Sequence, residues 1–87
     1  MKRKDGFVLQ KVGDDTFAVA VTPAAARVGS MVKLNPTAAY LFDYLATERT
    51  EEDCIGAITA RYGIDRATAE RDVRAFLSGL KGAGLLA

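Results

Sequence analysis

The chain has 87 residues, of which 49% are hydrophobic and 26% charged, the proportions of one small globular domain covering residues 1–87. Twelve basic residues against eleven acidic ones give a formal net charge of +1, so no overall field draws the protein to nucleic acid or to an anionic membrane. No apolar stretch approaches the roughly 20 residues that cross a bilayer, and the single cysteine, Cys54, cannot form an internal disulfide, so we expect a cytoplasmic protein.

The chain opens with the pattern of a β-hairpin. Two β-prone runs, residues 7–12 and 16–21, are separated by Gly13-Asp14-Asp15, a loop of hairpin length and composition. Side chains in the second run alternate between large and small, with Phe17, Val19 and Val21 on one face and Ala18 and Ala20 on the other. Because large apolar side chains usually fill the core, we expect the face with Phe17 to point inward.

A connection and a short third strand follow. In the connection, residues 22–29, three consecutive alanines allow a helical turn, whereas Pro23 and Gly29 bound it as a loop, so both forms remain open. Residues 30–34 alternate as a short strand, with Val32 and Leu34 on one face and Met31 and Lys33 on the other.

Three helices complete the predicted order. Asn35-Pro36 joins the third strand directly to the first helix, because Asn is a strong N-cap and Pro is favoured at the first helical position. Thr50 and the acidic residues behind it begin the second helix, Gly63 ends it, and Asp65 begins the third. Each helix carries one apolar stripe: Ala38, Leu41, Phe42 and Leu45; Cys54, Ile55, Ile58 and Tyr62; and Ala69, Val73, Phe76, Leu77 and Leu80. Three strands followed by three helices predict an α+β, winged helix-turn-helix-like fold with a three-stranded antiparallel sheet.

The side-chain inventory argues against catalysis. The sequence contains no histidine, which excludes Ser-His-acid triads and the Cys-His pairs of thiol enzymes. Carboxylates are the remaining metal ligands, and the acidic run 51–53 is explained by the start of a helix without any cation. Cys54 lies on an apolar stripe, where a cysteine is usually a small core residue. We expect no enzymatic activity, no cofactor and no bound metal.

The last predicted helix carries four basic residues, Arg66, Arg71, Arg74 and Lys81, and the last helix of a helix-turn-helix can enter the major groove of DNA. Three acidic residues, Asp65, Glu70 and Asp72, lie among these bases. Specific DNA binding normally has a clear positive footprint. We therefore expect no nucleic-acid partner.

Four short motifs stand in order along the chain: "LNPTA" at 34–38, "RYGID" at 61–65, "DVRAFL" at 72–77 and "AGLL" at 83–86. Their order and spacing resemble those of the PqqD-like proteins, also called precursor-peptide recognition elements, over nearly the whole chain. The resemblance implies a small winged-helix-like domain without catalytic activity. It also implies a peptide chaperone of natural-product biosynthesis, which binds the leader of a ribosomally made precursor and presents it to a modifying enzyme, often a radical-SAM protein.

The resemblance further implies where the peptide binds. The leader adds as an extra strand to the edge formed by Met31, Val32, Lys33 and Leu34, and it packs against the last helix. Two flanks of that helix are alternatives for the opposite wall: Asp72, Ala75 and Gly79 on one side, and Glu70, Arg74, Leu77 and Lys81 on the other. We favour Arg74, Leu77 and Lys81, because leader segments often carry acidic and apolar residues together. The connection at 22–30 is longer than the common family pattern, which leaves the register of the edge strand open.

Two other functions stay open at this stage. One is a small winged-helix regulator that binds DNA. The other is a homodimeric interaction module in which two exposed strand edges pair with each other. For the favoured function we expect a monomer or a weak dimer.

Overall fold

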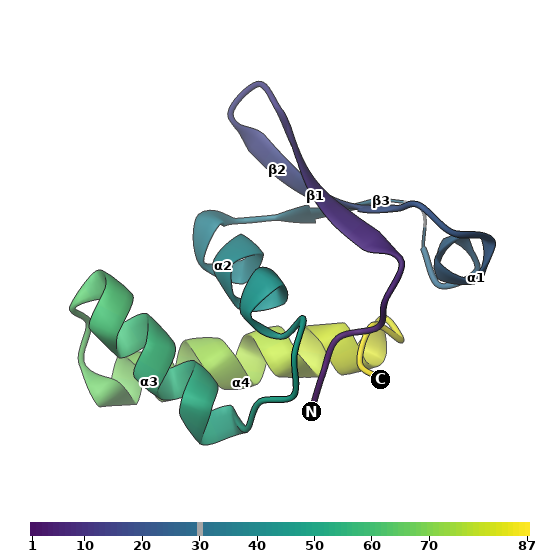
Figure 1. Ribbon diagram of the computed structural model, residues 1–87. Helices are drawn as coiled ribbons and strands as arrows, with labels where there is room; N and C mark the ends of the chain where they lie inside the picture. The colour runs from purple at the N-terminus through teal and green to yellow at the C-terminus, as the bar shows by residue number, and fades with distance from the viewer. Residues whose placement is uncertain (30) are drawn as a thin grey trace.

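Three antiparallel strands form one sheet in the order β1-β2-β3 (Figure 1). The computed structural model describes residues 1–29 and 31–87, so Ser30, predicted to open the third strand, lies outside the described residues. β1 (Phe7–Val12) and β2 (Asp15–Ala20) form a hairpin around a two-residue turn, where Gly13 has a φ of 64° that glycine adopts without strain. β3 (Met31–Leu34) pairs with β2. The turn is one residue shorter than predicted, so β2 begins and ends one residue early.

Four helices are present in the described residues, one more than predicted. α1 (Pro23–Ala26) is a single turn between β2 and β3, and the Ala25 N–H donates to Oγ1 of its N-cap Thr22 at 3.1 Å. The connection therefore adopts the helical form of the two that the sequence left open. α2 (Pro36–Tyr44), α3 (Glu51–Tyr62) and α4 (Arg66–Gly82) lie together on one side of the sheet (Figure 1). The predicted α+β fold class, a three-stranded antiparallel sheet followed by helices, is confirmed.

The three longer helices begin at the predicted capping residues, and α3 ends at the predicted Gly63. Oδ1 of Asn35 accepts a hydrogen bond from the Ala38 N–H at 2.7 Å, and Pro36 is the first residue of α2. Thr50 and Asp53 form a reciprocal capping box at the start of α3, which ends at Gly63 with a φ of 63°. Local chemistry thus fixes these boundaries, including the tight junction between β3 and α2.

The two faces of the sheet differ from the prediction. Ala18 is fully buried and Ala20 packs against the core, whereas Phe17 and Val19 lie on the opposite face and Val21 is 59% exposed. The predicted orientation of β2 was wrong because α2 packs against this strand, and small side chains leave the room that the large residues of α2 fill. We call the side away from the helices the outer face; it consists of Val8, Gln10, Val12, Asp15, Phe17, Val19, Met31 and Lys33.

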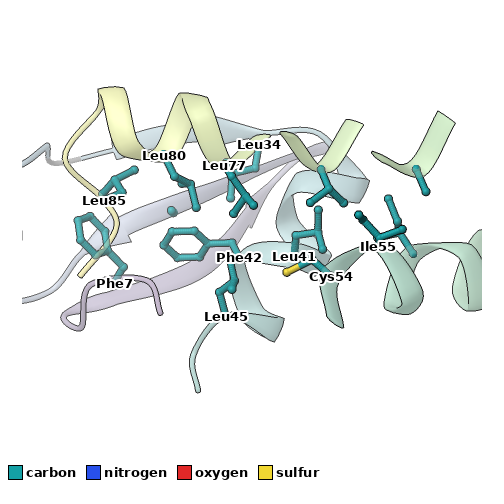
Figure 2. Close-up of a cluster of buried hydrophobic side chains, with 14 of the residues drawn as sticks. Phe7, Leu34, Leu41, Phe42, Leu45, Cys54, Ile55, Leu77, Leu80 and Leu85 are labelled. Carbon is teal, nitrogen blue, oxygen red and sulfur yellow. The ribbon is translucent and has the colours of Figure 1, made fainter. Parts of the chain in front are cut away.

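The core lies between the inner face of the sheet and the three longer helices (Figure 2). The ring of Phe7 meets that of Phe42 edge-on, with centroids 6.1 Å apart. Leu41, Phe42 and Leu45 are almost fully buried, and each such side chain contributes about 1.5–3 kcal/mol by leaving water. The predicted apolar stripes supply most of this cluster, but Tyr62, expected on the stripe of α3, is 40% exposed at the end of that helix.

Both chain ends are held against the fold and lie close together (Figure 1). The Lys4 N–H donates to the Leu85 carbonyl at 2.8 Å, and the Ala87 N–H donates to the Lys2 carbonyl at 2.8 Å. The basic residues at the start of the chain are thus part of a packed segment. Among the described helices, none is long and apolar enough to cross a membrane.

Candidate functional site

β3 is an edge strand, because within the described residues it pairs only with β2. Leu34 is buried and Val32 packs against the core, whereas Met31 is 55% exposed and lies with Lys33 on the outer face. Half of the backbone N–H and C=O groups of an edge strand point away from its neighbour. This edge can therefore accept another strand in extended conformation.

A cleft of about 300 Å³ begins where β3 ends. The junction of β3 and α2 supplies one wall and α4 the other; the lining residues are Asn35, Thr37, Ala38, Leu41, Asp72, Ala75 and Phe76. Farther along α4, a Cβ placed on Gly79 would meet nothing within 4 Å, so this flank of the helix stays open. The arrangement can hold an extended chain that pairs with β3 and places an apolar side chain in the cleft.

The candidate residues predicted from the sequence fall into three different surroundings. Met31, Val32, Lys33 and Leu34 form the free edge as expected. Leu77 is 9% exposed and belongs to the core with Leu34, as Figure 2 shows. Arg74 lies beside α3, with its Nε 3.5 Å from Oε1 of Glu51, and Lys81 is exposed in the last turn of α4. A role of Arg74, Leu77 and Lys81 in peptide binding stays a prediction.

The cleft uses the other flank of α4, the one with Asp72 and Ala75. Phe76, predicted on the apolar stripe of this helix, is partly buried against the core and also lines the cleft. Consecutive residues on a helix point about 100° apart, so Phe76 lies on the cleft side of the buried Leu77. Nothing in the sequence marked the contribution of Thr37, Ala38 and Leu41 to the same cleft.

Basic residues on the α3-facing side of α4 are paired with acids. The Arg66 guanidinium donates two hydrogen bonds to the Glu52 carboxylate, at 2.6 and 2.7 Å, and one to Glu70 at 2.9 Å. The hydrogen bonds between Arg66 and Glu52 raise the pKa of Arg66 and lower that of Glu52. Together with Arg74 beside Glu51, these pairs give α4 a charge-balanced surface, unlike a helix that reads DNA.

Asp72 supplies a carboxylate at the rim of the cleft. Its pair with Arg71 is long, 3.9 Å between Nε and Oδ1, so its oxygens can still accept hydrogen bonds from a bound chain. Asn35 is engaged in capping α2 through its side-chain oxygen. The cleft therefore combines an apolar interior with one acceptor group at its edge.

A second hollow, of about 340 Å³, lies on the opposite flank of α2. It is bounded by the hairpin, α2 and the end of α3, where the Arg61 guanidinium lies 4.5 Å from the ring centroid of Tyr40. Residues 1–29 and 31–87 contain no group of three or more His, Cys, Asp or Glu side chains placed to hold a metal ion. Cys54 is buried, and burial raises the pKa of its thiol above the usual range.

The sheet, the helices behind it and the open edge define a winged helix-turn-helix-like α+β domain with an exposed strand beside a cleft. More particularly, the chain belongs to the PqqD family, since the family model described as coenzyme PQQ synthesis protein D (PqqD) matches residues 9–86. The resemblance inferred from the four motifs is thereby confirmed. No curated protein matched the sequence significantly.

Two solved structures share this fold. TbiB1 in complex with the TbiA(beta) leader peptide has a TM-score of 0.74 and 29% sequence identity, over 99% of this chain and 94% of that one. A lasso peptide synthetase B1 complexed with its leader peptide has a TM-score of 0.70 and 24% identity, over 97% of this chain and 93% of that one. At the latter identity the similarity shows the fold alone.

Proposed function

We propose that this chain is a non-catalytic adaptor that captures the leader segment of a ribosomally synthesised precursor peptide and presents it to a modifying enzyme. The leader adds as a fourth strand to the free edge of β3. All 87 residues act as one recognition domain.

The observation that carries this proposal is the free edge of β3 next to the cleft. Backbone pairing along Met31–Leu34 supplies affinity for an extended chain, and the cleft supplies selectivity for one of its side chains. The cleft lies at the small end of ligand pockets, about 300 Å³, so it suits a single apolar side chain rather than a whole cofactor. Ala75 and Gly79 leave a shallow path over α4 for the rest of the leader.

Similar proteins support the peptide as the ligand. The two solved structures described above are both complexes with leader peptides. The structure with 29% identity aligns over almost the whole of this chain, the residues of the β3 edge and of the cleft included. In the structure of this chain, the flank of α4 with Asp72 and Ala75 lines the cleft.

The adaptor works without chemistry of its own. The chain lacks histidine, and its single thiol is buried with a raised pKa, so it provides neither an imidazole that titrates near neutral pH nor an accessible thiolate. A separate enzyme modifies the precursor, and we expect this enzyme to be a radical-SAM protein. The adaptor acts in the cytoplasm as a monomer or weak dimer.

Substitution of Ala75 tests this proposal. Ala75→Arg fills the cleft with a long charged side chain, whereas the control Ala67→Arg places the same change on an exposed position of α4 that does not line the cleft. The probe is the fluorescently labelled leader peptide of the precursor encoded beside this chain, and its affinity is measured by anisotropy. We expect Ala75→Arg to weaken binding by at least about tenfold and Ala67→Arg to leave it unchanged.

Three results would overturn the proposal. One is wild-type protein that does not bind the leader. Another is Ala75→Arg with wild-type affinity and wild-type thermal stability. The third is a stable dimer in which two β3 edges pair and the leader cannot compete, which would support the homodimeric module instead.

A further inference from the structure

Among the described residues that line the cleft beside β3, one side chain is ionisable, the carboxylate of Asp72. This side chain is 46% exposed, so the carboxylate lies at the rim and stays in contact with water. Ala38, Leu41 and Phe76 supply the apolar interior, with Leu41 labelled in Figure 2. A bound chain therefore meets a single negative charge at the mouth of an apolar cleft.

The basic side chains of α4 mostly point away from this carboxylate. Arg66 and Arg74 lie on the side beside α3, where acidic residues of α3 pair with them. Lys81 follows Asp72 by about two and a half turns, so it projects from the opposite side of the helix. Arg71 is 76% exposed, and its Nε lies 3.9 Å from Oδ1 of Asp72, at the outer limit of an ion pair. A cation supplied by a ligand can approach Asp72 more closely than Arg71 does.

A strand added to β3 would reach the cleft with alternate side chains. Alternate residues of a strand point to the same face and lie about 6.8 Å apart, and a volume of about 300 Å³ corresponds to a cleft roughly 7 Å across. One side chain can therefore enter the apolar interior while another, two residues along, reaches the rim.

The chemistry of the rim favours a basic side chain at this second position. The methylene stem of lysine or arginine packs on apolar surface while its charged head stays in water. Hydrogen bonds from such a head to a carboxylate are shorter and stronger than those of neutral donors. An acidic residue at the same position would instead place a like charge beside Asp72.

We infer that Asp72 selects leaders by charge, pairing with a lysine or arginine two residues from the apolar residue in the cleft. This inference rests on the proposed function. Asp72 is thus a specificity-determining residue, which strengthens binding of a leader with the basic side chain and weakens binding of one with Asp or Glu there. The ligand class is an extended peptide with an apolar and a basic residue at alternate positions.

Two identical substitutions provide a matched test. Asp72→Asn removes the charge at the rim, whereas the control Asp43→Asn removes the same charge from α2 at the second hollow. The probes are the labelled leader peptide encoded beside this chain and versions of it in which each lysine or arginine is replaced by glutamine, one at a time. Affinities are measured by anisotropy at low and at physiological salt.

We expect Asp72→Asn to weaken leader binding about fivefold at low salt, as for a partly exposed ion pair, and less at higher salt because of screening. One glutamine leader should lose the same factor with wild-type protein and nothing further with Asp72→Asn, since both changes remove one interaction. Asp43→Asn should bind as the wild type does. The glutamine leaders leave the protein unchanged, so the test does not depend on the stability of the variant.

Wild-type affinity of Asp72→Asn, with binding still weakened by Ala75→Arg, would overturn the inference and leave leader capture intact. A loss in Asp72→Asn that couples to no basic residue of the leader would also overturn it, because Asp72 would then accept from the backbone or a hydroxyl group. Equal losses in Asp72→Asn and Asp43→Asn would reduce the effect to net charge and refute the selection. A wild-type protein that does not bind the leader would refute the proposed function and this inference together.

Discussion

Proline at two adjacent positions of β3 separates leader binding from folding. Along an antiparallel edge strand, successive residues alternate between pairing with the neighbouring strand and pointing their N–H and C=O groups outward. Of Val32 and Lys33, one therefore directs its N–H toward β2 and the other toward the free edge. Val32→Pro and Lys33→Pro each remove one of these donors and fix φ near −65°.

The size of each effect follows from the length of the strand. Four residues direct about half of their backbone groups, two N–H and two C=O, to the free side. Loss of one outward donor and obstruction of a neighbouring bond by the proline ring cost about 2 kcal/mol of leader binding, or about 30-fold in affinity. Loss of the inward donor instead costs roughly 1–3 kcal/mol of stability, and each kcal/mol lowers the melting temperature of a domain this size by about 4–8 °C.

Thermal denaturation and leader anisotropy are measured on both variants. We expect one variant to melt early, and the other to melt near the wild-type temperature but bind the leader about 30-fold more weakly. Lys33 also loses its surface ion pair with Asp15, a small effect. If the variant with wild-type stability binds the leader as tightly as the wild type, strand addition at β3 is refuted.

Other perturbations test separate parts of the account. Leu77→Ala should lower the free energy of unfolding by about 2–5 kcal/mol in a denaturant titration and leave the leader affinity of the folded protein unchanged; weaker binding at full stability would place Leu77 in the groove. Cap hydrogen bonds lower the pKa of Asp53 and Asp65, so the stability that these carboxylates contribute is present above about pH 4 and is lost as the pH falls through the lowered folded-state values. The melting temperatures of Asp53→Asn and Asp65→Asn should therefore fall less steeply with acidification than that of the wild type. A decrease as steep as in the wild type would contradict this. Duplex DNA should bind no better than about 10⁻⁴–10⁻⁶ M at physiological salt in a shift assay, whereas nanomolar, sequence-dependent binding would support a regulator. Cys54 should react with a thiol reagent only in denaturant, because burial raises its pKa; rapid labelling of the native protein would show that it is exposed.

Helix boundaries could be predicted from the sequence because their causes are local. Asn35, Thr50, Gly63 and Asp65 act within one turn of their own positions, and all four cap a helix where expected. The edge at residues 31–34 was implied by the family resemblance, and within the described residues β3 pairs only with β2.

The orientation of β2 could not be predicted from alternation alone. A strand pattern shows which side chains share a face, but the helix that packs on the sheet decides which face is buried. Here α2 lies against Ala18, and the larger Phe17 and Val19 remain on the outer face. The same tertiary origin explains the flank of α4 that meets the cleft: Arg66 and Arg74 lie on the side beside α3, and Asp72 and Ala75 line the cleft.

A nuclear magnetic resonance titration of isotope-labelled protein with the encoded leader peptide tests the central claim most directly. Strand addition beside the cleft predicts saturable amide shifts concentrated in residues 31–34, at the start of α2 and along residues 72–79 of α4. New protection of β3 amides from hydrogen exchange should accompany these shifts, because outward N–H groups acquire partners. Shifts confined to the tip of the hairpin or to α3, in a saturable complex, would show that the leader binds elsewhere.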